Sequence, residues 1–332
     1  DGQPAVCRGG GTARDPRDGL DEKLVFFAFA LGKRRRAVGR RLSGRLYRND
    51  LRPCGQIPAD SAPAGNGGGR QHGRHHAGRH PACGAGGGIA FALCEQYAKD
   101  GANVVLLDVN EESIKKNAEK VEALGGKALA IKTDLTSIVE IKAAMEEVEK
   151  IFGAVNVIAN CAGISLYNDI LEYEEKDWDL SLDLNLKGAF FLAQEGAKNM
   201  VRNNVKHGKI VSISSQAGVV GEPGGHAYGA SKAGVRMMTQ TMALDLAKYG
   251  ICCTAIAPGC TNTEMIRAYF KRACVLEGMT PEEFEKMRTD EIPLGRLAEP
   301  EEIANLMYFL SSDKANYITG CTIDITGGVV NV

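Results

Sequence analysis

Alternation between two kinds of sequence constrains the fold of this chain most. From residue 104 onward, short apolar runs alternate with longer stretches whose apolar residues recur at helical spacing. Short, wholly apolar runs are typical of parallel strands that are buried on both faces. The pattern therefore predicts the α/β class, with one Rossmann-type domain in which helices cover both faces of a doubly wound parallel sheet. The predicted strands are Val104–Leu107, Ala128–Lys132, Val155–Ala159, Ile210–Ile213, Cys253–Ile256 and Thr322–Ile325. The predicted helices are Ile89–Lys99, Glu111–Leu124, Ser137–Ile151, Lys176–Asn203, Ala227–Tyr249 and Pro300–Leu310.

The first 82 residues do not share this alternation. Residues 1–82 are rich in Arg, Gly, Pro and Asp, and they hold 16 Lys and Arg against 7 Asp and Glu. Residues 83–332 hold 24 Lys and Arg against 34 Asp and Glu. A basic, Gly-rich stretch without a sustained period is typical of a solvated, disordered tail. We therefore predict an irregular segment at 1–82, disordered or read from a displaced frame, followed by a folded domain at 83–332.

Three features of the first segment leave other interpretations open. The basic run Lys33–Arg36 would suit nucleic acid or a targeting signal. The apolar run Leu24–Ala30 would pair as a strand or promote aggregation. The four histidines between residues 72 and 80 would suit a metal ion, but no Cys or acidic ligand flanks them. We favour the solvated tail for the segment and predict no metal site in the chain.

A Tyr and a Lys stand four residues apart in the predicted helix over 227–249. Positions i and i+4 of a helix share one face, so the ammonium of Lys232 would lie beside the phenol of Tyr228. A nearby cation favours the phenolate over the neutral phenol, whose ordinary pKa is about 10. Ser215 follows a predicted strand, and its hydroxyl would hold a substrate oxygen. The three residues predict a proton-transfer site for a secondary alcohol or a ketone. The alternative is a surface helix that carries Tyr and Lys by chance.

These residues and several further motifs resemble the short-chain dehydrogenase/reductase family. The run 84–90, with Gly84 and Gly88, is similar to the family's glycine turn, and Asn160-Cys161-Ala162-Gly163 is similar to its NNAG motif. Asn185 matches the fourth catalytic position, and Pro258-Gly259 with Thr263 matches the segment after the sixth strand. The resemblance covers residues 83–328, in order and with family-like spacings. Cys161 stands where the family has a second Asn, which removes one stabilising hydrogen bond.

The resemblance implies a nicotinamide cofactor along the carboxyl ends of the strands. Glycines let the backbone approach a pyrophosphate, and the helix that follows offers free N–H groups. Asp108 lies about 20 residues past the glycine turn, where a carboxylate binds both ribose hydroxyls and repels a 2′-phosphate. This residue favours NAD over NADP. The residues assigned to the cofactor are Gly84, Gly88, Ile89, Asp108, Asp134, Leu135, Asn160, Ala162, Gly163, Tyr228, Lys232, Pro258, Gly259 and Thr263.

The junction at Cys83 conflicts with this assignment. The family has an apolar strand directly before its glycine turn. Residues 75–82 of this chain instead include Arg, two adjacent His and Pro, which do not suit a central buried strand. We therefore expect the first strand to be missing at this place. A chain that had lost its cofactor site in this way would be a non-catalytic remnant, and we keep this as an alternative function.

By resemblance, four residues carry the chemistry. Tyr228 is the acid/base that exchanges a proton with the substrate oxygen, and Ser215 donates a hydrogen bond to that oxygen. Lys232 lowers the pKa of the tyrosine and holds the nicotinamide ribose. Asn185 holds a water molecule in the proton relay to solvent. The hydride chemistry belongs to the cofactor, and the protein supplies position and electrostatics.

The substrate is less sharply defined than the reaction. Residues 264–293 form a long, polar segment that would cover the site as a mobile lid. The family usually has Asp at the position of Thr326, and the Thr found here is similar to sorbitol-6-phosphate 2-dehydrogenases. Together with Asp108 these features favour a sugar alcohol or related polyol as the substrate of an NAD-linked enzyme. Much of the chain is equally similar to 3-oxoacyl-[acyl-carrier-protein] reductases, which use NADPH, and this is the alternative activity.

Composition bounds the setting of the protein. No apolar run approaches the roughly 20 residues of a membrane helix, and the formal net charge is −1, so we expect neither a membrane nor a nucleic-acid partner. Ten scattered cysteines without a CxxC pair are typical of a reduced, cytoplasmic protein. The resemblance implies a homodimer or homotetramer formed through the two long helices.

Overall fold

The protein folds around one parallel sheet of seven strands. The computed structural model describes residues 24–28 and 88–330. The strand order is β3-β2-β1-β4-β5-β6-β7, so the winding direction reverses between β1 and β4. The strands are β1 (Leu24–Ala28), β2 (Asn103–Asp108), β3 (Lys127–Lys132), β4 (Val157–Asn160), β5 (Lys209–Ile213), β6 (Cys252–Pro258) and β7 (Thr322–Ile325). The predicted doubly wound sheet is confirmed, and the predicted strands differ from the observed ones by one or two residues at some ends.

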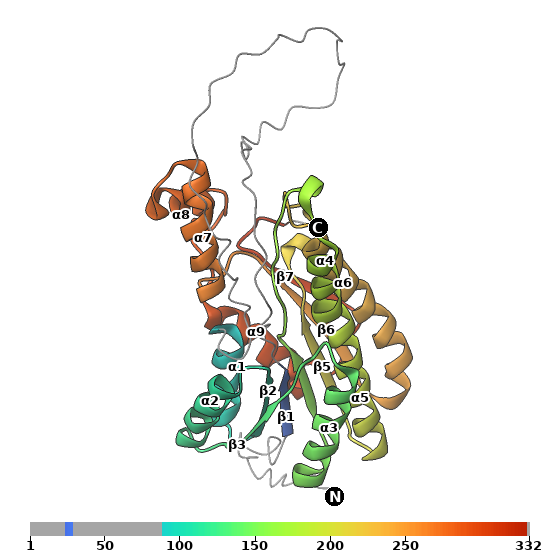
Figure 1. Ribbon diagram of the computed structural model, residues 1–332. Helices are drawn as coiled ribbons and strands as arrows, with labels where there is room; N and C mark the ends of the chain where they lie inside the picture. The colour runs from blue at the N-terminus through green and yellow to red at the C-terminus, as the bar shows by residue number, and fades with distance from the viewer. Residues whose placement is uncertain (1–23, 29–87, 331–332) are drawn as a thin grey trace, which may run out of the picture.

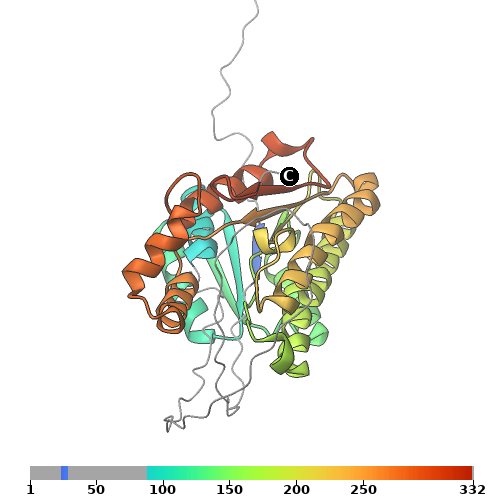
Figure 2. The ribbon, with the colours of Figure 1, turned by 90° about the horizontal axis from the view of Figure 1, so that it is seen from above.

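Helices cover both faces of this sheet (Figures 1 and 2). One face is covered by α1, α2 and α9, and the other by α3, α5 and α6. The α-helices are α1 (Gly88–Lys99), α2 (Glu111–Ala123), α3 (Ile138–Phe152), α4 (Glu175–Leu182), α5 (Ala189–Arg202), α6 (His226–Leu246), α7 (Glu264–Glu277), α8 (Pro281–Asp290) and α9 (Pro300–Ser311). Among the described residues no helix is long and apolar enough to cross a membrane.

The two faces of each strand feed two separate hydrophobic cores. In β2, Val104 and Leu106 pack with α1 and α9, whereas Val105 and Leu107 pack with the helices of the opposite face. All four side chains are fully buried. Because successive side chains of a strand point to opposite faces, a strand between two helix layers is apolar at most of its positions. This is why the strands could be recognised in the sequence as continuous apolar runs.

The central strand β1 comes from the N-terminal segment. Leu24–Ala28 pairs in parallel with β2 on one side and with β4 on the other, so that Phe26 stands between Val105 and Ile158. The sequence left open whether residues 24–30 pair as a strand or promote aggregation. The strand interpretation is confirmed for the first five of them. The expectation that the sheet lacks its first strand is therefore wrong, because a distant part of the chain fills that place. The basic run 33–36, the histidines 72–80 and Gly84 lie outside the described residues.

The predicted helix over 176–203 is divided in the structure. It consists of α4, a π-helical segment Asp183–Gly188, and α5. A π-helical turn holds one residue more than an α-helical turn, and such turns are frequent at functional sites. Here the π-helical segment carries Asn185, one of the predicted catalytic residues.

Gly188, at the end of the π-helical segment, lies against the backbone after β3. A Cβ atom on this residue would come within 2.5 Å of the Leu135 carbonyl oxygen and 3.2 Å of the Asp183 carbonyl oxygen. Backbone atoms cannot rotate away, so a side chain here would force two elements apart. We expect Gly188→Ala to lower the free energy of unfolding by about 1–3 kcal/mol, measured by urea denaturation. Gly221→Ala is the matched control, because a Cβ atom there meets nothing within 4 Å. Equal midpoints for the two variants would contradict the expectation.

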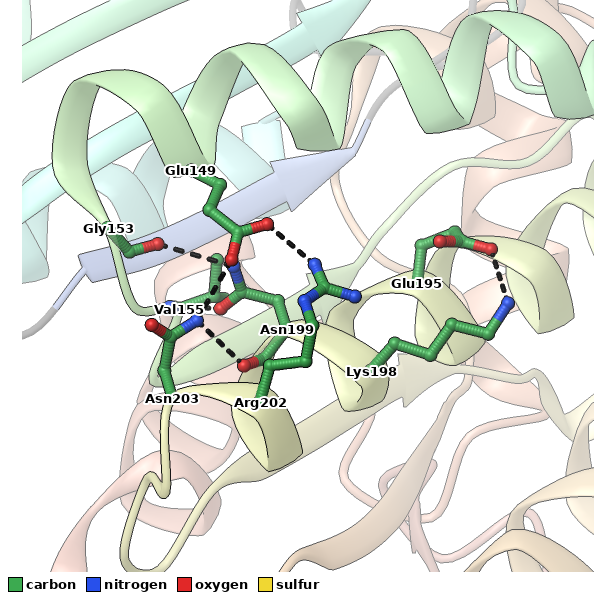
Figure 3. A network of polar contacts seen from close by, with 8 residues as sticks. All are labelled: Glu149, Gly153, Val155, Glu195, Lys198, Asn199, Arg202 and Asn203. Carbon is green, nitrogen blue, oxygen red and sulfur yellow. Dashed lines mark hydrogen bonds and ion pairs between the residues drawn. The ribbon is translucent and has the colours of Figure 1, made fainter.

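A polar network at the far end of α5 fixes the entry to β4 (Figure 3). The Asn199 side chain accepts a hydrogen bond from the Val155 N–H (2.7 Å) and donates one to the Gly153 carbonyl (3.3 Å). Beside it, Arg202 and Asn203 donate to the Glu149 carboxylate at 2.6 and 3.1 Å, and these bonds lower the pKa of Glu149. The network ties α3, α5 and the loop before β4 together, and so positions the strand whose other end reaches the functional site.

Helices α7 and α8 form the segment that was predicted as a lid. They pack on one another through a small apolar core of their own, separate from the two cores of the sheet. Its buried members are Phe270, Cys274, Phe284, Ile292 and Leu297. The segment thus has an apolar core of its own, and its role as a mobile lid stays a prediction.

Candidate active site

An open cavity lies at the carboxyl ends of β4, β5 and β6, with a volume of about 970 Å³ that includes open solvent at its mouth. Its walls are the start of α1, the loops after these three strands, the first turns of α6 and the start of α7. In doubly wound sheets ligands bind at this edge, near the point where the strand order reverses. The cavity is therefore the candidate active site.

The three residues predicted for proton transfer meet in this cavity. Ser215 follows β5 and caps a short 3-10 turn, with its Oγ accepting a hydrogen bond from the Ala217 N–H at 3.2 Å. Tyr228 and Lys232 lie one turn apart at the start of α6, and the Lys232 Nζ is 5.8 Å from the centroid of the Tyr228 ring. All three side chains line the cavity. The spacing of four residues thus places Lys232 beside Tyr228, as the sequence predicted.

Close packing holds α6 against the end of β5. Ser214 donates its hydroxyl to the Lys232 carbonyl at 2.7 Å. A Cβ atom on Gly218 would come within 2.9 Å of the Lys232 backbone, so only glycine fits at that place. These contacts fix the distance between the serine loop and the helix that carries Tyr228, which is what an acid/base acting on a bound oxygen needs.

Lys232 is a buried ammonium. It is only 3% exposed, and its Nζ donates a hydrogen bond to the Ile213 carbonyl at 2.9 Å. Burial lowers its pKa to about 8, and the neighbouring Cys161 thiol acts weakly in the other direction. A single buried cation beside the tyrosine creates a positive potential in the part of the cavity where a phenolate would form.

Asn185 is held by three hydrogen bonds at the base of the site. Its Oδ1 accepts from the Ile164 N–H (2.8 Å), and its Nδ2 donates to the Ile164 carbonyl (2.9 Å) and the Ser231 hydroxyl (3.1 Å). The side chain thereby connects the loop after β4 with α6. The water-holding role predicted for this residue stays a prediction.

The residues assigned to the cofactor fall into two groups. Eight of them line the cavity: Gly88, Ile89, Gly163, Tyr228, Lys232, Pro258, Gly259 and Thr263. Five lie outside it at or near the carboxyl ends of β2, β3 and β4: Asp108, Asp134, Leu135, Asn160 and Ala162. The remaining residue, Gly84, lies outside the described residues.

The described residues fit an elongated nucleotide that runs along this edge. Asn160 has a buried Oδ1 without a hydrogen-bond partner among the described residues, directly at the winding reversal. A Cβ atom on Gly163 would lie 3.2 Å from the Lys232 Nζ and 3.3 Å from the Asn185 Oδ1, so the loop after β4 passes close to both side chains. The Asp108 carboxylate ends β2 and accepts the Asn110 N–H at 2.8 Å. No three His, Cys, Asp or Glu side chains gather as a metal site within residues 24–28 and 88–330.

The cavity also contains polar residues that sequence reasoning missed. Tyr167, Gln216 and Glu222 line it. None of them belongs to a motif that the sequence analysis used. Gln216 and Glu222 lie in the run between Ser215 and Tyr228, whereas Tyr167 lies in another loop, after β4, so no single stretch of sequence pointed to all three.

Among the basic residues of the lid, Arg267 is paired within the protein. Arg267 forms an ion pair with Glu285 of α8 and donates to the Asn262 side chain at 2.8 Å. Lys271 is exposed. The lid instead presents Met265 and Ile266 to the cavity, so its contribution there is apolar.

Comparison with known proteins identifies the family. Residues 84–330 match the family model described as enoyl-(acyl carrier protein) reductase. The 3-oxoacyl-[acyl-carrier-protein] reductase FabG of Thermotoga maritima is 36% identical over 247 residues, which cover 74% of this chain and 95% of that protein. FabG of Staphylococcus aureus strain Mu50 is 38% identical over 250 residues, with 74% and 95% covered.

Solved structures agree with this result. Sorbitol-6-phosphate 2-dehydrogenase SrlD from Erwinia amylovora superposes with a TM-score of 0.70 at 34% identity, covering 74% of this chain and 96% of that one. A variant of actinorhodin polyketide ketoreductase with NADPH gives a TM-score of 0.72 at 28% identity, with 76% and 96% covered. The chain belongs to the short-chain dehydrogenase/reductase family and is an oxidoreductase that uses a nicotinamide cofactor.

Proposed function

We propose that this protein transfers a hydride between NAD(H) and a secondary alcohol or ketone, with a sugar alcohol or related polyol as the substrate. The observation that carries the proposal is the meeting of Ser215, Tyr228 and Lys232 in one cavity at the carboxyl edge of the sheet. A hydroxyl donor, a phenol and a buried ammonium are the groups that move a proton to or from a carbinol oxygen.

In this proposal each side chain has a distinct task. The bound nicotinamide supplies the hydride chemistry. Ser215 donates its hydroxyl hydrogen to the substrate oxygen and orients it toward Tyr228. The phenol gives up its proton to that oxygen in reduction and takes the proton back in oxidation. Lys232 stabilises the phenolate electrostatically and bonds the nicotinamide ribose, a role that its position close to Gly163 supports.

Asp108 supports NAD rather than NADP. A carboxylate at the end of β2 would accept hydrogen bonds from both ribose hydroxyls and would repel a 2′-phosphate. We expect the full chain to bind NADH at least about tenfold more tightly than NADPH, measured by fluorescence titration, since one unfavourable charge contact of about 1.4 kcal/mol gives that ratio. Asp108→Asn keeps an acceptor for the Asn110 N–H but removes the charge, and should reduce the preference. Asp179→Asn, on the exposed side of α4, is the matched control. Tighter binding of NADPH by the unmodified chain would contradict the assignment.

A second candidate activity is the reduction of 3-oxoacyl groups with NADPH. It is favoured by the FabG relatives, which match at 36–38% identity. The polyol reading is favoured by Thr326 near the C-terminus and by the SrlD neighbour at 34% identity. Turnover of acetoacetyl-CoA together with an NADPH preference would select the reductase, and NAD-linked oxidation of a polyol would select the dehydrogenase. A chain that binds neither nucleotide would be the non-catalytic remnant.

We further propose that the protein works as a homodimer or homotetramer. Large apolar side chains are exposed along the helices that the family resemblance assigns to subunit contacts. They are Trp178, Leu180, Phe190, Met237 and Leu244, which are 36–81% exposed. Light scattering coupled to gel filtration tests this directly.

The free thiols of the seven cysteines in the described residues support a cytoplasmic setting.

A further inference from the structure

A small polar cluster stands next to the catalytic tyrosine in the candidate active site. We call Tyr167, Gln216 and Glu222 the acceptor cluster. The Tyr167 hydroxyl donates to one oxygen of the Glu222 carboxylate, and the Gln216 Nε2 donates to the other at 3.3 Å. The Tyr167 ring lies 6.1 Å from the Tyr228 ring, centroid to centroid. The cluster is therefore within the reach of a substrate whose carbinol carbon sits at Tyr228.

The backbone around the acceptor cluster is shaped to hold it in place. The Asn168 N–H donates to the Gly224 carbonyl at 3.2 Å and joins the two loops that carry Tyr167 and Glu222. Gly224 has a φ of +76°, which favours glycine. A Cβ atom on Gly225 would come within 2.9 Å of the Tyr167 ring. Glycine at both positions just before α6 thus leaves room for the Tyr167 phenol to reach the Glu222 carboxylate.

One member of the acceptor cluster has an unused acceptor atom. Gln216 is only 8% exposed, and its Oε1 is buried without a hydrogen-bond partner in the part of the chain that the structure describes. Leaving a buried carbonyl unpaired costs about 1–3 kcal/mol, so a protein rarely keeps one without a use. The residue lines the cavity, where a ligand hydroxyl would satisfy it.

The charge of the acceptor cluster selects its ligand. The polar groups of its three members are a carboxylate, a buried amide oxygen and the oxygen of a phenol whose hydrogen is already donated. Among the described residues Glu222 has no ion-pair partner, and the guanidinium of Arg288 is bonded to Glu291 at 2.8 Å. An acceptor-rich, negatively charged wall attracts hydroxyl donors and repels a phosphate or a carboxylate.

We propose that the acceptor cluster binds the hydroxyl groups next to the reacting carbon, and that it restricts the substrate to molecules that are polyhydroxylated and uncharged at this end. This inference rests on the proposed function and names the specificity subsite of the same cavity. Glu222 accepts two hydrogen bonds from the protein and still has lone pairs for a substrate hydroxyl, and Gln216 supplies a second acceptor beside it.

The test compares Glu222→Gln with the unmodified full chain, using D-sorbitol as the probe in the presence of NADH. Removing a charged acceptor should raise the dissociation constant of sorbitol about tenfold or more, measured by ligand-observed NMR titration. Tyr167→Phe should raise it less, because the carboxylate stays but loses the donor that orients it. NADH affinity should not change in either variant. Glu282→Gln, at an exposed position of α8, is the matched control.

Steady-state kinetics separate this inference from the proposed function. With NAD, Glu222→Gln should raise KM for sorbitol and leave KM for cyclohexanol, which has no neighbouring hydroxyl, within about twofold. Polyol turnover that is unaffected by both variants would overturn the subsite and leave the proposed function standing. Weaker sorbitol binding in Glu222→Gln, in a chain that oxidises no alcohol, would overturn the proposed function and keep the subsite. A chain that does not bind sorbitol at all would overturn the subsite.

Discussion

Tyr228→Phe is expected to lower kcat by about 10²–10⁴-fold, the usual contribution of a positioned acid/base. The substitution removes the hydroxyl that exchanges a proton with the substrate oxygen. The ring remains, and so do its contacts with Tyr167 and with the Lys232 ammonium. Because the cofactor site keeps its shape, the dissociation constant of NADH should stay within about twofold. Stopped-flow measurement of hydride transfer and fluorescence titration of NADH give the two quantities.

The control for this change is Tyr317→Phe, which removes a hydroxyl from a fully exposed ring. That variant should keep the activity of the unmodified protein. A Tyr228→Phe protein that retains more than about a tenth of its kcat would contradict the assignment, because loss of an acid/base costs at least about 100-fold. Loss of NADH binding in the same variant would instead indicate damage to the structure around α6.

Much of the sheet could be predicted because its strands are buried on both faces. In β6 every residue is buried and all but Thr254 are apolar, so this strand is visible as a run in the sequence. The catalytic residues could be predicted for a different reason. A spacing of four on a helix fixes the relative position of two side chains, whatever else surrounds them.

The origin of the central strand could not be predicted in the same way. Local sequence shows that Leu24–Ala28 is apolar, but strand pairing depends on partners that are far away in the chain. The usual place for this strand is directly before the glycine turn, and the residues there are unsuited to it. Only the three-dimensional arrangement could show that the strand between β2 and β4 is one that 59 residues separate from the start of α1.

The acceptor cluster was missed because its residues have no fixed spacing. Tyr167 follows β4, whereas Gln216 and Glu222 follow β5, and they meet only because these strands are neighbours. A pattern search along the chain finds residues that share an element. It does not find residues that share an edge of the sheet. Specificity residues of doubly wound folds are commonly of this second kind, since ligands bind where several loops converge.

Replacing Lys232 with Met is expected to reduce kcat/KM by about 10²–10⁴-fold, since both the activation of the acid/base and the bond to the cofactor ribose are lost. Met fills nearly the same volume without a charge. Unlike Tyr228→Phe, this variant should also bind NADH more weakly, because in the proposed mechanism the ammonium holds the nicotinamide ribose. Unchanged NADH affinity would show that Lys232 acts on the tyrosine alone.

The same variant has a characteristic dependence of stability on pH. Burial lowers the pKa of Lys232 from its ordinary 10.5 to about 8, so the folded protein bears the full cost of a buried charge below pH 8. Between pH 8 and 10.5 the unfolded chain holds a proton that the folded protein has released, and the stability contributed by this group therefore rises with pH. From pH 7 to 9.5 the unmodified protein should gain about 2 kcal/mol relative to Lys232→Met, at about 1.4 kcal/mol per pKa unit. Other titrating groups, including the buried cysteines, are present in both proteins and cancel to first order in the difference between their urea denaturation curves. A difference that stays constant over this range would mean that the ammonium is solvated in the folded state, and its proposed role in holding the tyrosine as a phenolate would lose its electrostatic basis.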